Sequence, residues 1–122
     1  MVKIARESQV TIVELGADYN SLDEEALSRL SATLLKEAGE VTPPVLLVDL
    51  SGVNFIASNF LEILVRAWKR IKQRDGVMAL CGVTPFCAEV LKITRLNSLW
   101  AAFPNRAEAV AQLSSQANVQ SA

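Results

Sequence analysis

The sequence predicts a single α/β domain with a mixed, mostly parallel sheet of about five strands and about four helices. Residues 2–6 and 9–15 are interpreted as two short strands with a turn at Ser8–Gln9, and the second is rich in β-branched residues, which indicates a hairpin. Segments of strand and helix periodicity then alternate, which is typical of parallel strands joined by helical crossovers. The run 45–50 is apolar on both faces except at Asp49, as in a central strand covered on both sides.

The first helix is predicted to begin at a capping box, Ser21–Glu24, and to end at Gly39. Between them, apolar residues recur at helical spacing and would form one buried stripe: Leu22, Ala26, Leu27, Leu30, Leu34 and Leu35. Pro43 and Pro44 block a continuation of this helix and lead into the strand at 45–50.

The second half of the chain repeats the alternation of helix and strand. Further helices are predicted over 59–75, 84–94 and 105–113, and further strands over 77–82 and 99–103. Thr84 and Pro85 supply a hydroxyl N-cap and a first-turn proline, and Asn105 with Glu108 resembles another cap. The domain is expected to span 1–113, followed by a flexible tail at 114–122.

Composition narrows the class of function. The chain has 122 residues, 12 basic and 13 acidic, with a net charge of −1, which disfavours nucleic acid as a partner. No apolar run approaches the roughly 20 residues of a membrane helix, so no direct membrane insertion is expected. The N-terminus lacks the apolar core of a secretory signal. We therefore expect a cytoplasmic protein.

The sequence also disfavours an enzyme. It contains no histidine, which removes Ser-His-Asp and Cys-His nucleophiles and histidine metal sites. Cys81 and Cys87 fit neither a CxxC redox pair nor a zinc site and are interpreted as reduced structural thiols. No glycine-rich phosphate-binding loop is present. No catalytic residue, cofactor or metal is therefore predicted.

One serine lies where a functional site is expected. Ser58 follows the central strand and the Ser51–Gly52 break, and it opens an amphipathic segment. A helix N-terminus presents unpaired N–H groups and favours negative charge. With no histidine to activate it, Ser58 is a candidate for modification or contact rather than a nucleophile. Asp49, on the buried strand, is interpreted as a hydrogen-bonded anchor for the loop.

The segments Asp49–Val53 and Phe55–Leu61, together with the order of elements, resemble the STAS domain, the family of anti-sigma-factor antagonists and of domains appended to sulfate transporters. The resemblance covers about residues 10–113. In this family, a serine that begins the helix is phosphorylated by a partner serine kinase. Ser58 matches that serine, and Leu61 matches the leucine that follows it. The resemblance therefore implies Ser58 as a phosphoacceptor.

The residues around Ser58 depart from the family pattern. Ala57, Asn59 and Phe60 stand where the family has an acidic residue, a second serine and a glycine, and Glu62 replaces a small residue. Asn59 and Glu62 could instead form a capping box, which would bring a negative charge close to a phosphate. Phe60 would be an interface anchor if exposed and a core residue if it tilts inward.

Two functions remain open from the sequence. The first is a regulatory module in signal transduction and transcription control, which binds a serine-kinase anti-sigma factor, with a possible phosphorylation switch at Ser58. The alternative is a non-phosphorylated accessory subunit of a transporter ATPase or a signalling assembly. The expected partner-binding residues are Asp49, Ser51, Ala57, Ser58, Asn59, Phe60 and Glu62.

Several other residues have competing interpretations. The basic cluster comprises Arg66, Lys69, Arg70, Lys72 and Arg74. It is either a solvated face that complements the helix C-terminus or a docking site for an acidic partner. Trp68 is expected in the core because of its helical spacing. Trp100 is expected to be half-buried in the last strand.

Overall fold

The chain begins with a tight hairpin, as the polar pair at Ser8–Gln9 predicted. The computed structural model describes residues 3–15, 24–53, 56 and 58–121. Strand β1 (Lys3–Glu7) pairs antiparallel with β2 (Val10–Glu14). Ser8 and Gln9 have φ angles of 50° and 72°. Positive φ at both central residues is the signature of a type I′ turn, whose twist matches that of the paired strands.

The remaining strands are parallel and follow one another in sequence order. They are β3 (Val45–Asp49), β4 (Val77–Cys81) and β5 (Ala101–Phe103). The sheet order is β1-β2-β3-β4-β5, and only the β1–β2 pair is antiparallel. β3 is buried at every residue and lies at the centre of the sheet. The predicted fold class, a mixed and mostly parallel sheet of five strands, is confirmed.

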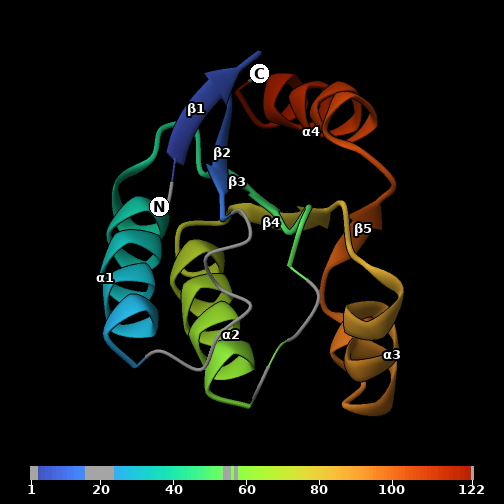
Figure 1. The fold of residues 1–122 in the computed structure, drawn as a ribbon. Coiled ribbons are helices and arrows are strands. Elements are labelled where there is room, and N and C mark those ends of the chain that lie inside the picture. The colour runs from blue at the N-terminus through green and yellow to red at the C-terminus, as the bar shows by residue number, and fades with distance from the viewer. Residues whose placement is uncertain (1–2, 16–23, 54–55, 57, 122) are drawn as a thin grey trace.

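Four α-helices cover the sheet unequally (Figure 1). They are α1 (Glu24–Glu40), α2 (Ser58–Lys72), α3 (Pro85–Ile93) and α4 (Arg106–Ser121), with a short 3-10 turn at Leu96–Ser98. The first three share one apolar cluster on one face, and α4 packs on the other. Right-handed crossovers between strands in sequential order place their helices on one face, which leaves the opposite face for the terminal helix.

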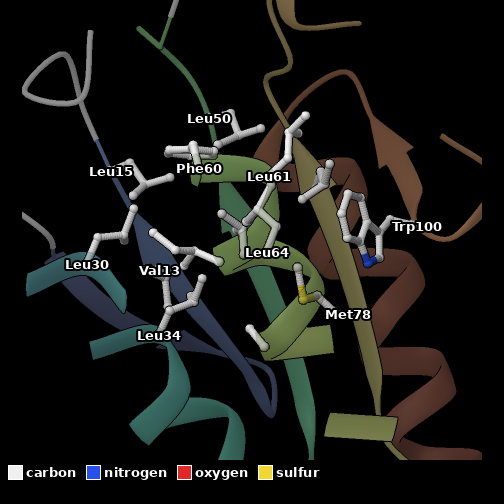
Figure 2. Packing of buried hydrophobic residues seen from close by; sticks show 14 of the residues in the cluster. Val13, Leu15, Leu30, Leu34, Leu50, Phe60, Leu61, Leu64, Met78 and Trp100 are labelled. Carbon is white, nitrogen blue, oxygen red and sulfur yellow. The ribbon is translucent and has the colours of Figure 1, made fainter. Parts of the chain in front are cut away.

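The larger cluster lies between the sheet and helices α1 to α3 (Figure 2). The predicted leucine stripe of α1 is confirmed, since Leu27, Leu30 and Leu34 are buried in this cluster. Trp68 is partly buried and packs against it, as expected of a core residue. Trp100 was expected to be half-buried but is only 4% exposed, because it precedes β5 and packs into the cluster instead of lying in that edge strand.

The C-terminal ends of α1 and α4 differ from the sequence prediction. α1 continues through Gly39 to Glu40, and the N–H of Val41 still bonds the carbonyl of Glu37, because a single glycine costs a helix only about 1 kcal/mol. The capping box predicted at Ser21–Glu24 lies largely outside the described residues. α4 runs on to Ser121, so the segment at 114–121 continues the helix, and its flexibility stays a prediction.

Two arginines of the basic cluster, one in α2 and one in the turn that follows it, bind the backbone of α1. Arg70 and Arg74 donate to the carbonyl oxygens of Leu35 and Ala38 at 3.1 Å each. Ala38 is among the last four residues of α1, whose carbonyl groups lack intrahelical partners and attract cations, and Leu35 lies about one turn before it. Arg74 therefore complements the C-terminus of the neighbouring helix, whereas the solvated-face interpretation concerned the terminus of the helix that carries the cluster.

Candidate functional site

Ser58 is the first residue of α2, and its side chain is exposed. The first four N–H groups of a helix have no intrahelical acceptor. The side chain of Asn59 accepts one of them, from Phe60 N to Oδ1 at 2.9 Å. The first turn of α2 contains no acidic residue, and its last turn contains three basic residues. The serine hydroxyl therefore lies at the positive end of the helix dipole.

The capping box predicted from Asn59 and Glu62 is wrong. That box requires Phe60 as the first helical residue, but the helix begins two residues earlier, at Ser58, and the side chain of Asn59 accepts the adjacent amide of Phe60. Glu62 instead reaches along the helix to Arg66, with 2.7 Å between carboxylate and guanidinium. This pair is the i,i+4 arrangement that is favourable on an exposed helix face. The negative charge of Glu62 is therefore partly balanced and does not cap the helix.

Phe60 takes the inward of its two expected orientations. Its side chain is 2% exposed and belongs to the large cluster. Figure 2 shows the ring turned toward Leu15 and Leu50, at the end of the sheet where the loop to α2 begins. Phe60 thus holds the start of α2 against the sheet, and the side chains that remain exposed there are Ser58, Asn59 and Glu62.

The exposed residues at the start of α2 border a shallow groove shared with α1. The groove has a volume of about 320 Å³. It is lined by Leu27, Ser28, Ser31, Asn59, Glu62, Ile63 and Arg66. Its walls carry hydroxyl, amide and charged groups over an apolar floor. This combination suits contact with a protein surface better than enclosure of a small molecule.

Asp49 anchors the loop that leaves β3, as expected. It is 6% exposed, and its Oδ1 accepts the backbone N–H of Ser51 at 2.9 Å. Its Oδ2 accepts a hydrogen bond from Arg106 at 3.0 Å. Burial by itself would raise the pKa of Asp49, but the hydrogen bonds from Ser51 and the charge of Arg106 outweigh it and hold the pKa below its ordinary value.

The sequence interpretation missed Arg106, at the start of α4. Its guanidinium lies 2.8 Å from Glu14, 3.0 Å from Asp49 and 3.9 Å from Glu7. The hydrogen bond to Glu14 is the largest of the effects that raise the pKa of Arg106. One side chain therefore links α4 to three strands. No local pattern marks it, because these partners lie far away in the sequence.

The loop between β3 and α2 is also held by two side chains at the start of α3. Thr84 Oγ1 donates to the carbonyl oxygen of Val53 at 2.8 Å, and Cys87 Sγ lies 3.2 Å from the same oxygen. Thr84 occupies the predicted N-cap position before Pro85, but its hydroxyl makes no capping bond. The loop between β3 and α2 is thus tied at its beginning to Asp49 and further along to α3. Ala57 lies outside the described residues.

The described residues contain no candidate for redox or metal chemistry. Both cysteines are free and buried, and burial raises the pKa of Cys81 to about 12, which keeps it a thiol. Within the described ranges, no group of three or more acidic or cysteine side chains could hold a metal ion. In the same part of the chain, no helix is both long and apolar enough to cross a bilayer.

Gly82 follows β4 and lies beside Asp49 and Ser51, where a larger side chain does not fit. Gly82→Ala is therefore expected to lower the free energy of unfolding by about 1–3 kcal/mol. Its φ is +65°, and a Cβ there would lie 2.1 Å from Ser51 Oγ and 3.2 Å from Asp49 Oδ1. Urea denaturation measures the change. Gly39→Ala is the matched control, because it fills a helical position against the flexible side chain of Arg70 and should be neutral or stabilising. Equal effects at both glycines would contradict this assignment.

Comparisons with known proteins agree on one family and one fold. The family model described as the STAS domain matches residues 2–109. An anti-sigma-factor antagonist (STAS) domain protein from Planctomyces limnophilus is 37% identical, with a TM-score of 0.85, and the match covers 93% of this chain and 97% of that chain. No curated protein matches the chain at a significant level.

Two more distant structures share the fold. A structure of the stressosome, a signal integration and transduction hub, matches with 18% identity and a TM-score of 0.74 over 94% of this chain and 98% of that chain. The Bacillus cell-fate determinant SpoIIAA, solved in its phosphorylated form, matches with 14% identity and a TM-score of 0.69 over 92% and 98%. At these identities the likeness extends to the fold alone.

Proposed function

The chain belongs to the STAS domain family, and from this premise we propose that it is a regulatory protein-binding module that resembles an anti-sigma-factor antagonist. STAS domains are typically non-catalytic regulatory modules. The proposed partner is a serine-kinase anti-sigma factor in the cytoplasm. The proposed contact surface is formed by Ser58, Asn59 and Glu62 together with the groove between α1 and α2.

The observation that carries this proposal is the exposed hydroxyl of Ser58 at the first residue of α2. A phosphate there would bring about −1.5 to −2 charges at neutral pH. The positive end of the helix dipole and the first-turn amides would stabilise it. Because Glu62 is paired with Arg66, its charge would oppose the phosphate less than a capping carboxylate would. Phosphorylated SpoIIAA, a relative in fold, supports a modified state that stays folded.

The proposed switch acts on the partner's surface rather than on the fold. Asp49 and Phe60 hold the loop and the helix start from within, so modification of Ser58 leaves the core contacts intact. A docked partner would have to desolvate the phosphate, which costs several kcal/mol unless it is paired. Phosphorylation is therefore expected to release the partner.

The test is a phosphorylation and binding experiment with the serine-kinase anti-sigma factors of the same organism. Incubation with kinase and ATP should place phosphate on Ser58, as located by mass spectrometry. Ser58→Ala should bind the kinase without accepting phosphate. Ser58→Asp should weaken binding at least about tenfold. Ser98→Ala, at an exposed serine outside α2, is the control and should behave as wild type. An unmodified Ser58 together with no kinase complex would overturn the switch.

A second candidate is a non-phosphorylated accessory subunit of a transporter ATPase or signalling assembly. It is favoured by Phe60, which fills the core where the family pattern has a glycine, and by Asn59, whose side chain is engaged with the helix start. The stressosome structure is a relative in fold that belongs to such an assembly. Co-purification of an ATPase that is equally retained by Ser58→Ala and Ser58→Asp would favour this candidate over the switch.

A further inference from the structure

We propose that two copies of this chain pair antiparallel through their β1 strands and join their sheets into one continuous sheet. β1 is an edge strand, and in the described part of the chain no strand lies on its outer side. Four of its five residues are exposed, and Ala5 is partly buried. An exposed edge with free backbone groups is a template for pairing with another strand. The sequence of β1 is suited to pairing with the β1 strand of a second copy of this chain.

The hairpin determines which backbone groups of β1 face outward. Glu7 pairs with Val10 across the two-residue turn, and a turn of this type bonds the carbonyl of its first residue to the N–H of its last. Glu7 therefore directs its backbone groups toward β2. Since these groups alternate along an antiparallel strand, Ala5 and Lys3 also face β2. The N–H and C=O groups of Ile4 and Arg6 face away from the sheet.

This alternation defines one symmetric register for a second copy. With a two-fold axis at Ala5, Ile4 of each copy lies opposite Arg6 of the other. The two pairs then use all the outward-facing groups, for about four backbone hydrogen bonds. Ala5 faces Ala5 in a closely spaced, non-hydrogen-bonded pair, where a small side chain is suitable. Lys3 faces Glu7 of the other copy, twice by symmetry.

The side chains agree with this register. Ala5 packs against the cluster beneath α4, and Glu7 lies 3.9 Å from Arg106 of that helix. Lys3 shares this face by the strand alternation, so the Lys3–Glu7 pairs would form on one side of the joined sheet. On the other side Ile4, which is 43% exposed, would be covered by the aliphatic stem of Arg6.

The charged residues of β1 favour a second copy of this chain as the partner, and they favour the register with the two-fold axis at Ala5. Charged residues on an edge strand ordinarily discourage pairing, but here Lys3 faces Glu7 when the strand is read antiparallel, and Arg6 faces the uncharged Ile4. Moving the axis one residue toward the turn would place Arg6 opposite Arg6, a like-charge contact that destabilises a sheet. None of the exposed residues proposed to contact a kinase lies on β1, so the pair does not use them.

The first test measures association and its dependence on charge. Sedimentation velocity from about 10 μM to 1 mM should show a reversible dimer. Lys3→Glu alone and Glu7→Lys alone should each weaken it at least about tenfold, because two attractive contacts become repulsive. An equimolar mixture of the two variants should recover a heterodimer of near wild-type affinity. Lys92→Glu, an exposed residue of α3, makes the same charge change as Lys3→Glu and should have no effect.

The second test uses the unmodified chain. As concentration rises, hydrogen exchange should slow at the amides of Ile4 and Arg6, whereas Ala5 is already bonded within the hairpin and should not change. A monomer at every concentration would overturn the proposal. So would a dimer that is insensitive to both charge variants, or one whose added protection falls outside β1.

Discussion

Replacing Phe60 with alanine is expected to lower the free energy of unfolding by about 3–5 kcal/mol. The ring is 2% exposed, and it is among the largest fully buried side chains of the described chain. Removing it costs the transfer free energy of the ring and leaves a cavity at the start of α2. For a domain of this size, the midpoint of thermal unfolding should fall by roughly 10–20 °C. Calorimetry together with urea denaturation would measure both quantities.

Phe86→Ala is the matched control for this change. Phe86 lies on α3 and is 49% exposed, so the same substitution should cost well under half as much. Phe60→Leu retains most of the buried volume, and it should retain partner binding as well, because Phe60 acts from within the core. A Phe60→Leu variant that is stable and yet fails to bind the partner would indicate that Phe60 contacts the partner directly.

Replacing Asp49 with alanine is expected to cost about 3 kcal/mol at neutral pH. The carboxylate is buried, and its loss leaves the N–H of Ser51 without its acceptor and Arg106 without one of its anionic partners. Asp49→Asn should cost less, because an amide oxygen can still accept from Ser51. Chemical denaturation would measure both, with circular dichroism to verify the fold. A change below about 0.5 kcal/mol in the alanine variant would contradict the anchoring role.

The contribution of Asp49 should also depend on pH. Its pKa is lower in the folded protein than its ordinary value of 3.8. A carboxyl with a depressed folded pKa binds protons more readily when unfolded, so stability falls with falling pH. The advantage of wild type over Asp49→Asn should be full above about pH 4 and should shrink as the pH falls through the lower, folded pKa. An advantage that is constant down to pH 2 would contradict this linkage.

Local signals predicted most of the elements, because each depends on residues close together in the chain. The positive-φ turn at Ser8–Gln9 and the cap at Asn105 are examples, the latter confirmed by a bond of 2.9 Å from Glu108 N to Asn105 Oδ1. Local reasoning failed where two local signals competed. Asn59 and Glu62 have the spacing of a capping box, but the carboxylate of Glu62 forms a salt bridge with Arg66 one turn further along the helix.

The sequence by itself determined the class of fold, the family and the position of Ser58 at a helix start, since periodicity, caps and a contiguous motif carry those. Only the tertiary structure decided which side chains support that position. Arg106 reaches Asp49 across 57 residues of sequence, and Arg70 reaches Leu35 across 35. The inward orientation of Phe60 and the burial of Trp100 depend on neighbours from other elements. Such contacts form only when the helices pack against the sheet, and no local sequence pattern encodes them.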